Sequence, residues 1–195
     1  MLLIFARIVT TGSWIAVLGF LLIYHNSVKK YLPNIQLPIK QSSIGNAVRI
    51  IFYPLFYSVL WINETSLENT LDPKWVLSSV FIGFILVITG VCLMILAIKA
   101  LYDKRLVSVS QLDFSIFETN PFTIIRHPFY SAEIIIWLGS AMMFINPSGF
   151  ILGILMFIPM LKMQAKRDEA SLFAAYGDSY LMHKTKVGKF FPKIW

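Results

Sequence analysis

The residues best suited to chemistry form the run Arg126-His127-Pro128-Phe129-Tyr130, which stands where a polar stretch meets an apolar one. Proline restricts the preceding residue to an extended conformation and fits the first position of a helix, so Pro128 is predicted to open a helix. A helix start offers unpaired backbone N–H groups and the positive end of its dipole, and Arg126 and His127 stand beside it. This pattern predicts a site for a carboxylate. The alternative is that both basic residues only mark a membrane interface.

A second group of charged residues, Lys166-Arg167-Asp168-Glu169, follows the last apolar block of the chain. Helical spacing places Lys162, Lys166 and Glu169 near one face, and Gly177 is suited to ending that helix. Viewed alone, such a group is also typical of a solvated helix face with weak ion pairs. It therefore indicates a function only in combination with the run around Arg126.

The elements that must position both groups are apolar. Of the 195 residues, 57% are hydrophobic and 14% charged, and the mean hydropathy of +0.70 is typical of a membrane protein rather than a soluble domain. The apolar residues form blocks at about 2–24, 48–62, 75–102, 129–145 and 149–161. We predict an all-α, polytopic membrane protein with about five transmembrane helices, because a helix satisfies its own backbone groups in lipid.

The last two apolar blocks are separated only by Asn146, Pro147 and Ser148, which predicts a helical hairpin followed by a charged tail. We divide the chain into transmembrane helices over residues 1–102 and a cofactor-binding, catalytic region over residues 103–195. The single cysteine, Cys92, lies within an apolar block, where we expect it to pack. One cysteine forms neither a disulfide framework nor a thiolate metal site, and no metal is expected.

The net charge of +7 does not indicate nucleic acid, because the basic residues lie in loops and tail beside apolar blocks. Membrane lipids are the expected partner. The loop after the first block is basic, the next loop is acidic, and the 103–128 loop and the tail are basic again. Because cytoplasmic loops are enriched in Lys and Arg, we predict a multi-pass protein with its N-terminus outside and its tail in the cytoplasm. The sequence indicates no oligomeric state.

From Pro121 to Pro192 the chain resembles the isoprenylcysteine carboxyl methyltransferases and the related phospholipid N-methyltransferases, which are membrane-embedded enzymes. That family carries an Arg-His-Pro-x-Tyr run, a Gly and an Asn in a helical hairpin, an acidic pair, an aromatic-Gly-x-x-Tyr element and a terminal Pro. The matching residues here are Arg126, His127, Pro128, Tyr130, Gly139, Asn146, Asp168, Glu169, Tyr176, Gly177, Tyr180 and Pro192.

The resemblance implies S-adenosylmethionine as the cofactor and a lipophilic methyl acceptor. By charge, the cofactor carboxylate is assigned to Arg126, His127 and the helix start at Pro128, its ammonium to Asp168 and Glu169, and its adenine or sulfonium to Phe129 or Tyr130. Arg126 and Glu169 are the expected catalytic residues. A prenylcysteine carboxylate is the first choice of acceptor, because it is ionised at pH 7 and needs only a cation such as Arg126 to position it.

One departure from the family pattern bears on the acceptor. Gln164 stands where the family usually has an arginine, with Lys166 and Arg167 close by as substitutes. A phospholipid amine is therefore an alternative acceptor, and it would require a base such as Glu133 or His127. Two other classes also fit parts of the pattern: the NADPH-dependent sterol reductases, whose C-terminal region looks similar, and a non-catalytic membrane scaffold that keeps the fold.

Overall fold

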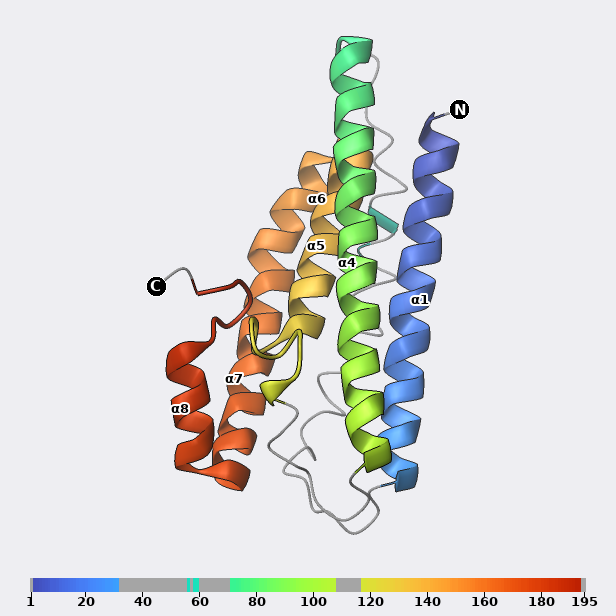
Figure 1. Cartoon of the computed structure of the whole chain (residues 1–195). Coiled ribbons are helices and arrows are strands. Elements are labelled where there is room, and N and C mark those ends of the chain that lie inside the picture. Colours follow the sequence, from blue (N-terminus) through green and yellow to red (C-terminus); the bar gives the residue numbers. More distant parts are fainter. Residues whose placement is uncertain (1, 32–55, 57, 60–70, 108–116, 194–195) are drawn as a thin grey trace.

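The computed structural model describes residues 2–31, 56, 58–59, 71–107 and 117–193. The named elements in these ranges are all helical. In chain order they are α1 (Leu2–Tyr31), α4 (Pro73–Val107), α5 (Pro128–Met143), α6 (Pro147–Leu152), the π-helical turn η3 (Gly153–Phe157), α7 (Ile158–Tyr176) and α8 (Asp178–Lys186). Helices α1 and α4 lie side by side, α5 packs against α4, and the chain returns through α6 and α7 (Figure 1).

Helices α4 and α5 form the main helix contact of the fold, and two facing glycines allow it. A Cβ atom on Gly83 would lie 2.6 Å from the Gly139 carbonyl oxygen, and a Cβ atom on Gly139 would lie 2.6 Å from the Gly83 oxygen. Small residues at such a contact allow the backbones of membrane helices to approach closely. Val80, Val87 and Met143 are buried around it. This contact holds α5, which directly follows the charged residues Arg126 and His127, against the longest of the described helices.

The predicted helical hairpin is present, and its turn is fixed by Asn146. This residue is fully buried, and its side-chain oxygen accepts a hydrogen bond from the Gly149 N–H at 3.0 Å. Pro147 follows as the first residue of α6, as is common at helix starts. The indole of Trp137 in α5 donates to the Gly149 oxygen at 3.3 Å. The apolar block at 149–161 and the helical part of the tail continue from this cap without a break as α6, η3 and α7.

The predicted count of about five spans is not confirmed. Within the described ranges, two helices are long and apolar enough to cross a membrane, at Pro73–Leu101 and Pro147–Tyr176. Helix α5 has 16 residues and is about 24 Å long, which is short of a bilayer core of about 30 Å. The apolar part of α1 that is described, Ile4–Gly19, is also short. The predicted span at 48–62 lies largely outside the described residues.

Most of the long apolar surface of α4 is exposed, in keeping with a lipid environment. Ile85, Ile88 and Leu96 all face outward from this helix. Cys92 is exposed too, so the prediction that it packs in the interior is wrong. In a helix surrounded by lipid, an apolar neighbourhood in sequence does not distinguish the buried face from the lipid-facing one.

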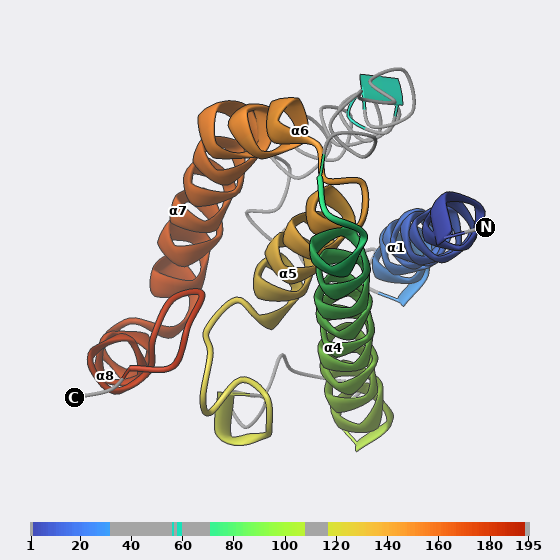
Figure 2. The same ribbon diagram turned by 90° about the horizontal axis from the view of Figure 1, so that it is seen from above.

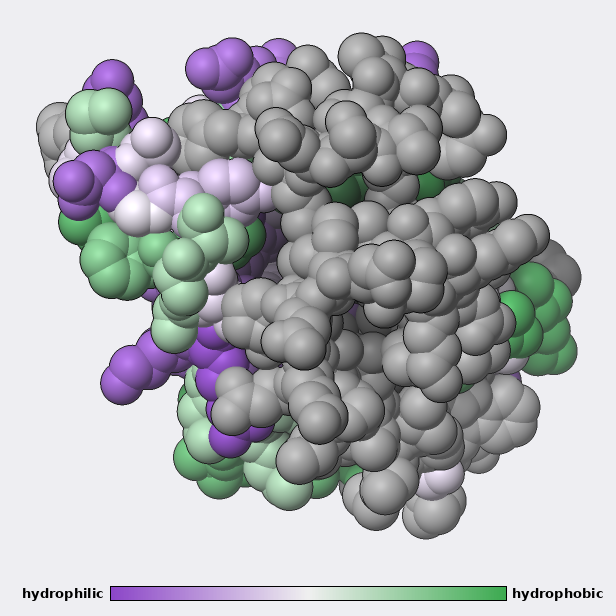
Figure 3. Space-filling model, turned by 90° about the horizontal axis from the view of Figure 1, so that it is seen from below, coloured by the Kyte–Doolittle hydropathy of each residue, from purple (hydrophilic) through white to green (hydrophobic). Residues whose placement is uncertain are grey.

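Beyond the hairpin, α7 and α8 form an arm that carries most of the charged residues of the tail. Figure 2 shows α7 extending away from the pair of α4 and α5, with α8 at its far end. Gly177, with φ of 55°, ends α7 as predicted. Seen from below, hydrophilic surface gathers on the side of this arm and is interleaved with apolar patches (Figure 3). The arm thus combines a membrane-type helix start with a polar end.

Candidate active site

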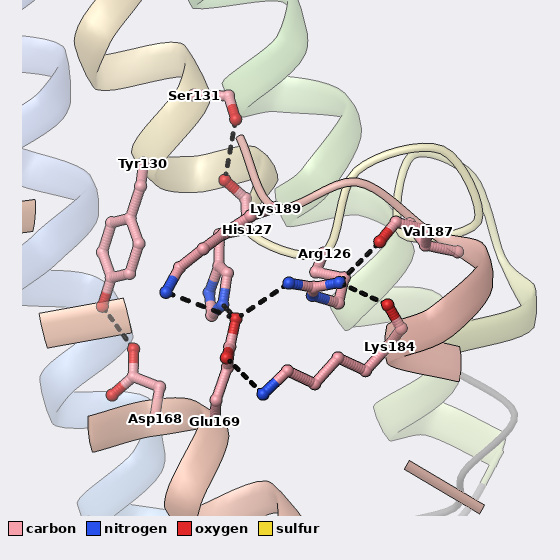
Figure 4. Close-up of polar contacts among 9 residues, drawn as sticks. All are labelled: Arg126, His127, Tyr130, Ser131, Asp168, Glu169, Lys184, Val187 and Lys189. Carbon is pink, nitrogen blue, oxygen red and sulfur yellow. Dashed lines mark hydrogen bonds and ion pairs between the residues drawn. The ribbon is translucent and has the colours of Figure 1, made fainter. Parts of the chain in front are cut away.

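Glu169, on the buried face of α7, lies at the centre of a group of basic side chains (Figure 4). Arg126 Nη2 is 3.1 Å and His127 Nε2 is 3.3 Å from its Oε1 atom. Lys184 Nζ lies 3.2 Å from Oε2, and Lys189 Nζ lies 3.4 Å from Oε1. Arg126 and both lysines are cationic at neutral pH. The group therefore keeps an excess of positive charge around one carboxylate.

Arg126 contacts both Glu169 and the tail of the chain. Its Nη1 atom donates to the Lys184 carbonyl oxygen at 2.7 Å and to the Val187 carbonyl oxygen at 2.6 Å. A planar guanidinium can serve the carboxylate and two carbonyls at once because its donors diverge in a fixed fork. The loop before α5 and the end of α8 are thus joined by one side chain.

The backbone makes the same connection. The N–H groups of Arg126 and His127 donate to the carbonyl oxygens of Gly188 and Lys189, at 2.9 and 3.1 Å. Gly188 stands at a point where a Cβ atom would lie 1.8 Å from the Phe191 carbonyl oxygen, so only glycine fits this turn. The tail is therefore fixed across the start of α5, and this brings Lys189 to Glu169.

Asp168, beside Glu169 in sequence, has a different environment. Its Oδ2 atom accepts a hydrogen bond from the Tyr130 hydroxyl. The His127 ring stacks on Tyr130, with 5.4 Å between ring centroids and 16° between planes. In the part of the chain that the structure describes, Asp168 forms no ion pair. The two neighbouring carboxylates thus have different partners: Glu169 is surrounded by cations, and Asp168 accepts a hydrogen bond from a tyrosine.

Three buried polar atoms in this region have no hydrogen-bond partner among the described residues. They are Nε of Arg126, Oε1 of Gln164 and the hydroxyl oxygen of Tyr180. Gln164 precedes Asp168 by one helical turn of α7, which places both residues on the same face. Because buried polar groups are nearly always paired, unpaired donors and acceptors gathered in one region suit a polar ligand.

The remaining predicted site residues are placed as follows. Pro128 is the first residue of α5, as predicted, and His127 is its N-cap. Phe129 packs edge-on against Phe122, with ring centroids 6.3 Å apart. Lys166 and Arg167, the suggested substitutes for the family arginine, are exposed. The structure thus brings together Arg126, His127, Tyr130, Asp168 and Glu169, and it leaves the two neighbouring basic residues outside the group.

Sequence reasoning did not find Lys184 or Lys189 as members of this region, and it included Tyr180 only as part of the family pattern, with no role at the site. Each lies in the tail, far along the chain from the run at 126–130, and no local pattern links them to it. One signal was available for Lys189, because it follows Gly188 in a short aromatic segment suited to a turn toward the helices. For Lys184 there was no such signal, since basic residues in the last turn of a helix are common.

Comparison with known proteins identifies the class to which this arrangement belongs. It places the chain among membrane-embedded methyltransferases. A family model for phospholipid methyltransferases matches residues 78–179, which are 102 of the 195 residues. The chain belongs to this phospholipid methyltransferase family. The predicted membership in the wider group of membrane-embedded methyltransferases, which includes isoprenylcysteine carboxyl methyltransferase-like enzymes, is confirmed. No match was found among curated proteins or among solved structures.

Proposed function

We propose that this protein transfers a methyl group from S-adenosylmethionine to a lipophilic acceptor within the membrane. The observation that carries the proposal is the separation of charge at the site: an excess of cations around Glu169 and, beside it, the carboxylate of Asp168, which has no ion pair among the described residues. Methyltransferases of this family typically use this cofactor. The basic loop and tail favour a site on the cytoplasmic side.

The residues present fit the charges of S-adenosylmethionine. Its carboxylate is suited to the cation group and to Nε of Arg126, which has no hydrogen-bond partner among the described residues. Asp168 suits its ammonium, because a carboxylate without an ion pair gains a charge-assisted contact there. Tyr130 presents an aromatic face beside Asp168, and such a face attracts a cation. Glu169 then affects the ligand indirectly: it positions the cationic side chains around it and does not itself contact the ammonium.

When bound, S-adenosylmethionine supplies a methyl group on a positively charged sulfur, which is open to in-line attack by a nucleophile. The protein contributes mainly orientation and exclusion of water. Arg126, His127 and Lys189 hold the ligand from the tail side, whereas Tyr130 and Asp168 hold it from α5 and α7. The tail fixed over the start of α5 limits the access of bulk water to this point.

The two candidate acceptors differ in what they require of Gln164. A carboxylate acceptor needs a cation there, whereas the chain has a neutral amide, and its buried oxygen has no donor among the described residues. An amine acceptor offers N–H donors, which an amide oxygen can accept. These features and the match to phospholipid methyltransferases favour a phospholipid amine over the prenylcysteine carboxylate that the sequence suggested first.

An amine acceptor must lose a proton before it can attack, so a base is needed. Glu133 lies about one turn into α5 from Tyr130 and is 1% exposed. Such a buried acid in a membrane helix is a functional candidate. We assign it as the group that would receive the proton of the ammonium, and bound S-adenosylmethionine would supply the methyl group to the neutral amine.

The cofactor assignment is tested by ligand-induced stabilisation of the purified protein in detergent. S-adenosylmethionine should raise the unfolding temperature, whereas NADPH should not. Asp168→Asn should weaken S-adenosylmethionine at least about tenfold, or about 1.4 kcal/mol, because a charge-assisted contact is lost. Asp178→Asn, which removes an exposed acid at the start of α8, is the matched control and should leave affinity unchanged. Stabilisation by NADPH alone would support the reductase class instead.

The acceptor assignment is tested by Gln164→Arg, which adds the guanidinium that the family pattern usually has at this position. With an amine acceptor, the added charge should repel the headgroup and lower transfer to phospholipid amines at least about tenfold, equivalent to about 1.4 kcal/mol. Ala170→Arg adds the same charge on the exposed face of α7 and should have little effect. A gain of transfer to a prenylcysteine, without loss on amines, would contradict the assignment.

A further inference from the structure

Tyr180, in α8, is a buried residue with no role in the function proposed above. It is 1% exposed and is among the largest fully buried side chains. Its hydroxyl has no hydrogen-bond partner among the described residues. A phenol this deep in a protein normally finds a partner for its hydroxyl.

The ring of Tyr180 is held by its aromatic neighbours, so the hydroxyl is not free to turn toward solvent. Phe117 packs edge-on against it, with ring centroids 5.8 Å apart. Phe117 also contacts Tyr176 at 5.8 Å and His183 at 5.0 Å, which fixes the whole group. A tyrosine side chain has few rotatable bonds, and the packing against Phe117 leaves the Tyr180 ring little room to adopt another position.

The charges around the hydroxyl define what it can bind. Tyr180 lies within electrostatic reach of Glu169, Arg126 and Asp168. Burial, together with the negative charges of Glu169 and Asp168, raises the pKa of Tyr180 well above its ordinary value. The hydroxyl therefore stays protonated at neutral pH and is available as a donor. Neither Glu169 nor Asp168 accepts a hydrogen bond from this hydroxyl, which has no partner among the described residues.

We infer that the Tyr180 hydroxyl is a further cofactor-binding group and donates a hydrogen bond to the carboxylate of bound S-adenosylmethionine, alongside Arg126. This inference rests on the proposed function. A carboxylate here would meet two donors that have no partner among the described residues, the Tyr180 hydroxyl and Nε of Arg126. It would also balance the excess of positive charge around Glu169.

The test is Tyr180→Phe, which removes one oxygen atom and keeps the ring. We expect the dissociation constant for S-adenosylmethionine, measured by calorimetric titration, to rise at least about tenfold. We expect the unfolding temperature of the ligand-free protein to stay the same or rise, because the atom removed has no partner there. Tyr176→Phe, the same change on a ring that also packs on Phe117, is the matched control and should leave the affinity unchanged.

A second ligand identifies the part of the cofactor that is contacted. Decarboxylated S-adenosylmethionine lacks the carboxylate, so Tyr180→Phe should change its affinity less than about twofold. An unchanged affinity of Tyr180→Phe for the intact cofactor would overturn the inference, and so would an equal loss for both ligands. A fall in the unfolding temperature of the ligand-free variant would assign the hydroxyl to folding instead. If the unaltered protein binds neither ligand, the proposed function itself fails.

Discussion

Replacing Glu169 by Gln is expected to lower the free energy of unfolding, because Glu169 is the carboxylate at the centre of the cation group. The change leaves Arg126, Lys184 and Lys189 close together without the carboxylate that they share. Removing one partner of a buried ion pair typically costs about 3 to 5 kcal/mol, and the partial exposure of both lysines places the loss near about 3 kcal/mol. Chemical denaturation in detergent should show this loss of unfolding free energy.

The same variant should bind S-adenosylmethionine at least about tenfold more weakly, a loss of about 1.4 kcal/mol in binding free energy. The cationic side chains that hold the ligand would lose their fixed positions. Glu133→Gln provides the comparison. It should leave cofactor affinity nearly intact and lower the rate of transfer, since Glu133 is assigned to the acceptor. Equal, small effects of the two changes on affinity would contradict the role of Glu169 in organising the cation group.

Arg126→Lys is expected to lower methyl transfer about a hundredfold, equivalent to about 2.7 kcal/mol of activation free energy. The guanidinium reaches Glu169 and the carbonyls of Lys184 and Val187 together. A lysine keeps the positive charge but offers one ammonium in place of a planar fork, so it cannot make the same set of contacts. The tail and the ligand would both lose their alignment with α5.

Transfer rate at saturating cofactor and acceptor is the measurement for this variant, with circular dichroism to show that the helices remain. Arg167→Lys is the matched control, because Arg167 is exposed on α7 and lies outside the cation group. If Arg126 served only as an interfacial anchor, Lys would replace it without loss. An unaltered rate would therefore leave His127 and the helix start to position the ligand.

Local chemistry made several parts of the fold predictable from sequence. Pro128 opens α5, Asn146 caps the hairpin and Gly177 ends α7, since each of these roles depends on the backbone preferences of a single residue. The meeting of Arg126 with the acidic pair was also predictable, because loop charges placed both on one side of the membrane.

The number of spans and the full site were less accessible to sequence reasoning. The length of an apolar segment does not by itself decide whether the helix crosses a membrane, and α5, with 16 residues, is an example. Lys184 and Lys189 reach Glu169 only through the return of the tail, which depends on pairing between residues about sixty positions apart. The division at residue 102 and the membrane orientation stay predictions.

The pairing of the tail with the start of α5 sets an order of events during biosynthesis. Helices α4 and α5 are made and can enter the membrane well before residues 184–190 leave the ribosome. Until then Arg126 and His127 lack the carbonyls of Val187, Gly188 and Lys189, to which they donate in the finished protein. Premature termination before residue 184 should therefore yield a polypeptide that still inserts in the bilayer but never acquires a working catalytic centre.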